Sequence, residues 1–552
     1  MTESLTATAP LTRFALRRDR VRIAMWIAGI VLLVVATVGS VKGLYPNQAE
    51  LDKAARASED NAAAIIFNGP VQGLDTVGGQ VAFQTGAWGL ILMGLMSVFM
   101  VGRLARGEEQ AGRVELLRAL PVGPHSLAAA AMVTVAAMNV VSGALVVLAL
   151  VALGLPTTGS VVFGLSFTLF GLLLAACTLA AAQVSENTRV VYGIGGVVLG
   201  ASFVLRAIGD IGDGTISWLS PIGWAQKTRP FAGERWWPFL VVVGATGLMA
   251  WLAVILSRRR DLGAGLVAPR TGRARAGASL GSPLGLAVRL QRGGLIGWGA
   301  GLAVLAVAYG SITDSINDFV EDNETLTDII AAQGQGTLVE QYLAMSFRTL
   351  ALLAAAFAIQ SSLRIRSEET STYAEQVLAT PVSRMRWAVS HLMIAFAGTL
   401  LVLFLVGATF GVADAAVTGD TSAIWRSIVG SLAYAPAVWV LVGLSAAIVG
   451  IAPRAAALPW AALAGCFVIG MFGQLLDLAP AIQDLSPFQH VPQYPAAELR
   501  VLPLLALAAL AAGLTAIGLA GLRHRDIGSE PERRMRDLYR SRVTRRPPKT
   551  VA

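Results

Sequence analysis

Two stretches of the sequence carry the same acidic side chains at the same spacing. The first, from Arg106 to Gly123, reads RGEEQAGRVELLRALPVG, and the second, from Arg366 to Ser383, reads RSEETSTYAEQVLATPVS. At one constant offset and without a gap, the identical residues include Glu108 and Glu368, Glu109 and Glu369, Glu115 and Glu375, Ala119 and Ala379, Pro121 and Pro381, and Val122 and Val382. Carboxylates repeated in this way can bind basic side chains of a partner, whereas anionic lipid repels them.

The first stretch predicts one amphipathic helix over 106–120. Glu109 and Arg113 are four residues apart in the favourable acidic-first order. The apolar stripe consists of Leu116, Leu117 and Leu120 in the first copy and of Val377 and Leu378 in the second. Each copy ends before Pro121 or Pro381, because the residue that precedes a proline disfavours helical angles.

Two interpretations of the repeated helix are open. A helix that rests on a lipid surface is expected to turn lysines and arginines toward anionic headgroups. The retained residues here are three glutamates per copy, so the charge pattern favours a surface that docks a protein. A partner with two equivalent surfaces is the natural match for a surface that occurs twice.

The elements that position these helices are membrane spans. The chain has 552 residues and is 55% hydrophobic but only 14% charged, against roughly 25% charged in soluble proteins. Recurrent long apolar runs predict an all-α polytopic membrane protein. Cys177 and Cys466 lie singly inside such runs, which excludes a disulfide framework or a cysteine metal site. The net charge of +9 comes from arginines crowded into loops, so it bears on topology and predicts no nucleic-acid partner.

About twelve runs are long enough to cross the bilayer. They cover 23–42, 84–103, 126–153, 160–183, 189–208, 238–257, 295–313, 343–363, 387–412, 425–450, 455–476 and 501–522. Arginines gather in alternate loops, at 104–125, 184–188, 258–294, 364–386, 451–454 and after Arg523. The opposite loop 314–342 is acidic. Since basic loops stay inside, we expect a multi-pass protein of the bacterial plasma membrane with both termini cytoplasmic.

The repeat extends over whole halves of the chain. LSPIGW at 219–224 follows the fifth span, and LSPFQH at 485–490 follows the eleventh. Basic lead-ins that end at Trp26 and Trp298 precede the first and seventh spans. Two parallel six-helix repeats follow, each with its cytoplasmic helix. The predicted parts are a first half at 1–257, a linker at 258–285, a second half at 286–523 and a basic tail at 524–552.

The loop 209–237 departs from the charge pattern because it holds Lys227, Arg229 and Arg235 on the outer side. It also contains Trp218, Trp224, Trp236 and Trp237. Tryptophans of this kind suit a belt at the membrane surface, and the basic residues either face headgroups or guard an exit. Arg206 and Arg348 lie near the outer ends of their spans, where we expect that they can snorkel to the outer surface. His391 is either a satisfied interior histidine or lines a path.

Groups for chemistry on a bound substrate are missing. None of Lys42, Lys53, Lys227 and Lys549 lies in the G-x-x-x-x-G-K-[ST] loop that cradles phosphates. Neither H-E-x-x-H, nor a nucleophile elbow, nor a cluster of metal ligands occurs. We therefore predict no catalytic residues, no metal, no cofactor and no enzyme activity of the chain itself.

The sequence resembles the membrane subunits of ABC-2 type exporters, and in its double length the actinobacterial permeases of tetronasin-type antibiotic and multidrug exporters. The resemblance lies in EEQAGRVELLRALPV at 108–122, in EETSTYAEQVLATPV at 368–382 and in the two LSP segments. The second copy departs at Thr372 and Tyr373, where the first has Gly112 and Arg113.

This resemblance implies a permease that moves small hydrophobic or amphipathic compounds, including antibiotics and drugs, out of the cell. The repeated helices would couple its halves to two copies of a separate cytoplasmic ABC ATPase. The coupling residues would be Glu108, Glu109, Arg113, Glu115, Leu117, Pro121, Glu368, Glu369, Glu375, Val377 and Pro381. The LSP segments would form an outer loop that dips into the membrane and a possible exit, with Ser220, Pro221, Trp224, Ser486 and Pro487.

Two other classes remain as alternatives. A secondary, ion-coupled transporter with two parallel six-span halves needs coupling carboxylates inside its spans. Asp414 and Asp477 lie only at span ends. A membrane enzyme that acts on lipid needs a convergent catalytic cluster, and the sequence shows none.

Overall fold

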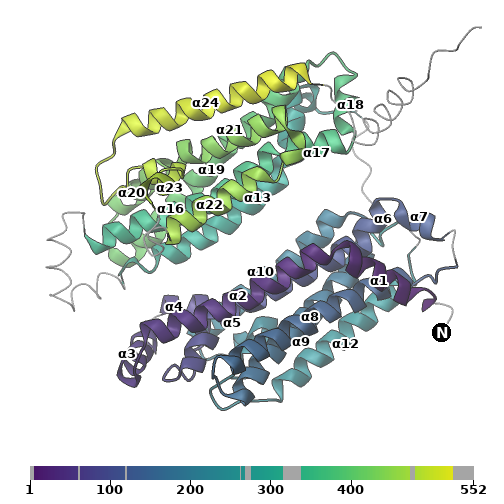
Figure 1. The fold of residues 1–552 in the computed structure, drawn as a ribbon, viewed down its shortest axis with the longest axis vertical. Coiled ribbons are helices and arrows are strands. Elements are labelled where there is room, and N and C mark those ends of the chain that lie inside the picture. Colours follow the sequence, from purple (N-terminus) through teal and green to yellow (C-terminus); the bar gives the residue numbers. More distant parts are fainter. Residues whose placement is uncertain are drawn as a thin grey trace, which may run out of the picture. The chain divides into compact units, whose positions relative to one another are not determined.

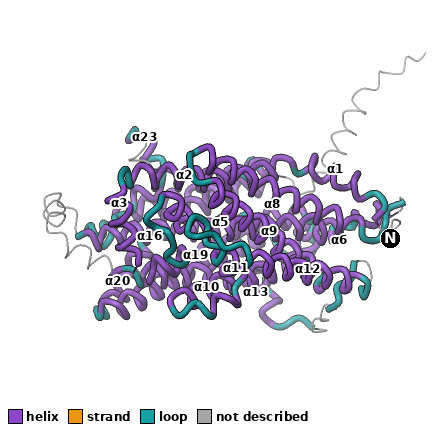
Figure 2. The backbone as a smooth tube through the Cα atoms, turned by 90° about the horizontal axis from the view of Figure 1, so that it is seen from below, coloured by secondary structure: helices purple, strands orange, loops and turns teal. Residues whose placement is uncertain are grey.

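A computed structural model describes residues 5–59, 62–118, 121–260, 263–267, 275–314, 337–472 and 479–525. Over these residues the regular elements are helices, and no strand occurs (Figure 2). The chain divides into two compact units, Met1–Gly272 and Arg273–Ala552 (Figure 1). The expected acidic loop 314–342, Asp477 and the basic tail 524–552 fall wholly or largely outside the described residues.

The first unit begins with α1 (Thr8–Arg18) and continues without a loop into the first long helix. Its elements are α2 (Arg20–Leu44), α3 (Gln48–Glu59), α4 (Ala62–Asn68), α5 (Val77–Gly102), a π-helical turn (Arg103–Gly107), α6 (Glu108–Gln110), α7 (Arg113–Arg118), α8 (Ser126–Ala152), α9 (Thr157–Val184), α10 (Thr188–Ile211), a 3-10 turn (Ile216–Leu219), α11 (Pro221–Gln226) and α12 (Pro238–Ser257). The chain after α12 runs back along the end of α9, where Leu266 N and Val267 N donate to Gln183 O and Val184 O.

The second unit has the same long helices in the same order. After a 3-10 turn (Ala278–Gly281), they are α13 (Pro283–Gly310), α16 (Leu338–Ser362), α17 (Arg364–Thr370), α18 (Tyr373–Leu378), α19 (Arg384–Thr418), α20 (Ser422–Leu432), α21 (Ala435–Ile451), a 3-10 turn (Pro453–Ala455), α22 (Leu458–Phe472), α23 (Pro480–Gln483), a 3-10 turn (Pro487–His490) and α24 (Val501–His524).

The two units share one packing scheme. In the first, α9 lies against α5, α8, α10 and α12, while α2 lies against α5 and α8. In the second, α21 lies against α16, α19, α22 and α24, while α13 lies against α16 and α19. Helix by helix these are the same neighbours, so the repeated sequence order produces a repeated bundle.

Close packing inside the first bundle depends on small residues. Gly143 of α8 faces Gly164 of α9, and a Cβ built on Gly164 would lie 2.6 Å from the carbonyl oxygen of Gly143. Two backbones that approach this closely have no room for a side chain, as is common between membrane helices. Gly143 and Gly164 therefore fix the distance between α8 and α9.

Eleven helical segments of the described chain are long and apolar enough to cross a membrane. They correspond to all expected spans except 455–476, where the structure has α22 of 15 residues. A helix of that length reaches roughly 22 Å, short of the hydrocarbon thickness of about 30 Å. Residues 473–478, which would complete this span, lie outside the described chain.

A labelling experiment tests the expected orientation. Single cysteines at Glu115, Arg275 and Glu375, in a variant without Cys177 and Cys466, are expected to react with an impermeant maleimide only after the cells are permeabilised. A cysteine at His490 is expected to react on intact cells, because it lies across the predicted bilayer. Reaction of the cysteine at 275 on intact cells would contradict the assignment of both termini to the cytoplasm.

Candidate coupling surface and its ion pairs

The repeated acidic motif is two short helices in each unit, so the expectation of one continuous helix over 106–120 was wrong. In the first unit, a turn at Gly112 with a φ of 69° separates α6 from α7. In the second unit, Thr372 has a φ of 61° at the same place and separates α17 from α18. The left-handed conformation costs a residue with a Cβ about 1–2 kcal/mol. The same break therefore forms with glycine and with threonine.

Two of the three glutamates in each copy are buried and bind arginines of their own unit. Glu108 pairs with Arg18 at 2.9 Å and Arg113 at 3.0 Å. Arg113 therefore does not form the expected pair with Glu109. In the second unit Glu368 pairs with Arg364 at 2.5 Å. These carboxylates are not available to a partner while the pairs are closed.

The second glutamate of each motif, Glu109 or Glu369, binds an arginine that lies much farther along the chain. Both carboxylate oxygens of Glu109 accept from Arg260, at 2.8 and 3.1 Å, and Glu109 also pairs with Arg106. Glu369 accepts from Arg525 at 2.5 Å and pairs with Arg366 at 3.4 Å. Our sequence interpretation missed Arg260 and Arg525. The sequence did contain a signal for these two arginines, because each lies within three residues after the sixth span of its half.

The third glutamate of each copy is exposed. Glu115 lies on α7 and Glu375 on α18, and Tyr373 beside it is exposed as well. Val377 is half-buried against the core of the second unit. Pro121 and Pro381 are exposed, and Leu117 lies on α7 with its side chain outside the described residues. The face open to a partner is thus that of α7 and α18.

In the LSP segment of the first unit, Ser220 is buried in the bundle while Leu219 is exposed. Ser220 caps α11 by accepting from Gly223 N at 3.1 Å, and Pro221 takes the first helical position. The Ser220 hydroxyl also lies 3.1 Å from that of Ser202 on α10. Trp224 is half-buried and donates from Nε1 to Trp218 O. These bonds fix α11 against α10.

In the second LSP segment, Ser486 is buried as well. It precedes a 3-10 turn that starts at Pro487, where the first unit has the α-helix α11. Phe488 stacks on Tyr434 of the second bundle, with ring centroids 6.5 Å apart. The segment lies against α21, α22 and α24. In both units the chain between the fifth and sixth long helices thus packs against helices of its own bundle.

Arg206 does not snorkel, contrary to expectation. Its side chain is fully buried and donates to Ile65 O at 3.0 Å and Ile66 O at 2.7 Å. Asp210, one turn on, lies 3.6 Å from its guanidinium. The two carbonyls belong to the last turn of α4, where Ile65 O also accepts from Gly69 N at 2.9 Å. The hydrogen bonds of the Arg206 guanidinium therefore hold the end of α4 against α10.

The lead-in helices of the two units differ in charge. Asp19, between α1 and α2, pairs with Arg18, Arg22 and Arg103, each at 3.0 Å. Burial opposes ionisation of this carboxyl, but the hydrogen bonds and charges of Arg18 and Arg103 outweigh it and keep the pKa of Asp19 below its ordinary value. The first unit thus keeps a fixed charge cluster at this junction.

Gln291 holds the place of Asp19 in the second unit, the same number of residues before the shared tryptophan. Its amide nitrogen lies 3.1 Å from Nδ1 of His391, and its oxygen accepts from Ser361 at 2.5 Å. All three side chains are buried. His391 is therefore a hydrogen-bonded interior histidine. At Gln291 helix α13 is unbroken, whereas at Asp19 the chain passes from α1 to α2.

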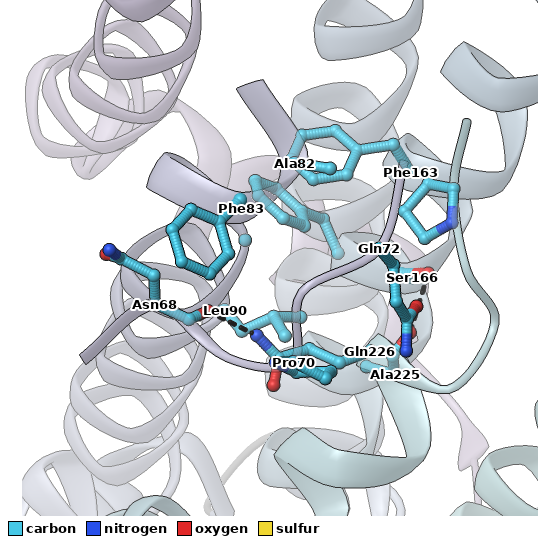
Figure 3. Close-up of a pocket in the computed structure, with 13 residues that line it drawn as sticks. Asn68, Pro70, Gln72, Ala82, Phe83, Leu90, Phe163, Ser166, Ala225 and Gln226 are labelled. Carbon is cyan, nitrogen blue, oxygen red and sulfur yellow. Dashed lines mark hydrogen bonds between the residues drawn. The ribbon is translucent and has the colours of Figure 1, made fainter. Parts of the chain in front are cut away.

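A pocket in the first unit lies between the chain before α5 and the helices α5, α9 and α11 (Figure 3). Phe83, Phe163 and Phe167 give it apolar walls, and Gln226 donates to Asn68 O at 2.8 Å across its mouth. Its volume is about 40 Å³. Drug-sized ligands need pockets of roughly 300 Å³ or more, so this one cannot hold such a molecule as it stands.

The long apolar helices and buried LSP segments define an all-α, multi-pass membrane protein. Among the described residues, no group of histidine, cysteine, aspartate and glutamate could hold a metal ion. Residues 280–523 match the family "Multidrug efflux system permease Rv1217c, C-terminal domain". The chain is 36% identical over 525 residues, 95% of each protein, to the multidrug efflux system permease protein Rv1217c of Mycobacterium tuberculosis (strain ATCC 25618 / H37Rv). The chain belongs to this family of multidrug efflux permeases.

Proposed function

We propose that this chain is the membrane subunit of an ATP-driven ABC-2 type exporter, similar to tetronasin-type antibiotic and multidrug exporters. It acts with two copies of a separate cytoplasmic ATPase and moves hydrophobic or amphipathic drugs out across the plasma membrane. Its membership in a multidrug efflux permease family supports the substrate class. The lack of a phosphate loop around any of its lysines supports a separate source of energy.

One observation carries the proposal. Each unit presents a short helix, α7 or α18, soon after its second long helix, and each bears an exposed glutamate at the matched position. Just before these helices, Glu109 and Glu369 bind Arg260 and Arg525, which ties the start of each motif to the chain after the sixth long helix. A rigidly mounted, twice repeated surface suits a partner that comes as two equal copies.

The test is reconstitution with a candidate ABC ATPase, sought first among the neighbouring genes. The purified chain alone is expected to show no ATP hydrolysis above background. The complex is expected to hydrolyse ATP, to do so faster when drug is added, and to fill inverted vesicles with drug only when ATP is present. The control is the same complex with the phosphate-loop lysine of the ATPase changed to alanine. Drug accumulation driven by a proton gradient without ATP would instead support the secondary transporter.

A further inference from the structure

In both units a carboxylate after the second long helix binds an arginine that directly follows the sixth. Arg260 is three residues beyond the end of α12 at Ser257, and Arg525 is the residue after α24 ends at His524. Their partners Glu109 and Glu369 hold identical places in the repeated motif. The same long-range pair is therefore built twice, across 151 residues in one unit and 156 in the other.

Both pairs are shielded from water. The side chains of Glu109 and Arg260 are 8% and 14% exposed, and those of Glu369 and Arg525 are 1% and 12% exposed. Screening by solvent and salt is weak at such burial. Separation of the partners would leave a buried arginine without its carboxylate, and Glu109 or Glu369 with only its nearby Arg106 or Arg366, so the closed pair is favoured.

Further bonds stiffen the link in the first unit. Gly263 N donates to Glu109 Oε1 at 3.2 Å, and Arg106 donates to Ala264 O at 2.9 Å. Gly265 lies against the end of α9, where a Cβ would approach Val184 O to 2.7 Å. The chain after the sixth long helix is thus bound to the motif by a side-chain pair and by backbone.

We propose that Glu109–Arg260 and Glu369–Arg525 are positioning links, which make the motif of each unit and its sixth long helix move as one body during transport. The inference rests on the proposed function, since the displacement is taken to start at an ATPase docked on α7 and α18. Without the ion pair, a displacement of the motif need not be passed on to the chain that leaves α12 or α24. Glu108 and Glu368, which pair with arginines of the lead-in helix or of their own helix, have no such reach.

The test uses the full chain with its ATPase and compares Arg260→Gln and Arg525→Gln with the exposed neighbours Arg259→Gln and Arg523→Gln. The link variants are expected to keep expression, ATPase co-purification and basal ATP hydrolysis. Their maximal drug efflux is expected to fall roughly tenfold, a usual size for coupling between distant sites, with the half-saturating drug concentration unchanged. Arg525→Lys retains the charge and is expected to restore most of the efflux.

Three outcomes overturn the inference. One is efflux at wild-type rate in both link variants. Another is loss of ATPase co-purification together with efflux, which would make the pairs part of the docking surface or of general stability. The third is an equal loss in Arg259→Gln or Arg523→Gln. If the wild-type chain binds no ATPase, the proposed function fails. The efflux of the link variants, compared with that of the exposed controls, still shows whether the two ion pairs are needed for transport.

Discussion

Replacement of Arg206 by leucine is expected to lower the stability of the first unit by about 3–5 kcal/mol, the usual cost of removing one partner from a buried pair. Asp210 would remain as a buried carboxylate, with only the Ser217 hydroxyl at 2.6 Å as a close donor. The carbonyls of Ile65 and Ile66 would lose the guanidinium as a donor, although Ile65 O would keep its bond from Gly69 N. Thermal unfolding of the purified chain in detergent measures the effect.

The exposed Arg235 provides the matched control, because Arg235→Leu makes the same substitution in a neighbouring loop without a buried partner. The double variant with Asp210→Leu is expected to recover most of the lost stability, since no charge is then left unpaired. An Arg206→Leu variant that unfolds at the wild-type temperature would show that the pair and the bonds to α4 contribute nothing.

Reversal of the exposed charges, Glu115→Lys together with Glu375→Lys, is expected to abolish both ATPase co-purification and drug efflux. Charges at an interface are arranged to meet opposite charges, and like charges brought together there cost several kcal/mol. The single variants are expected to lose part of the binding, because each leaves one of the two surfaces intact. Pull-down of the ATPase at matched expression measures the loss.

The control for this pair is Glu50→Lys together with Glu498→Lys, which makes the same change in net charge at exposed positions outside the motif. It is expected to bind and transport as wild type. Equal binding by the Glu115 and Glu375 variants would mean that α7 and α18 are not the docking surface, and a helix resting on lipid would then be the better account.

The long spans and the repeat could be predicted from the sequence because both depend on local information. An apolar run of about 20 residues has few alternatives to a span. The eleventh expected span, 455–476, is described only in part, as α22 from Leu458 to Phe472, because residues 473–478 lie outside the described chain.

The role of each glutamate could not be predicted in this way. Glu109 and Glu115 look alike in the sequence, but only Glu109 meets an arginine that lies 151 residues away. The break at Gly112 and Thr372 was equally hidden, because the two copies differ there in sequence and reach the same backbone conformation. Charge pairing across the fold, and not residue type, separates the buried carboxylates from the exposed ones.

The difference between Asp19 and Gln291 bears on how such a chain can evolve. In a homodimer every substitution appears twice, so a group that is harmful in either copy is lost from both. Here one chain holds both halves, and His391 occurs once per chain while the first half keeps its arginine cluster. Because the two halves are encoded separately within one chain, a substitution in one half is not repeated in the other, and the halves can acquire different side chains at matched positions.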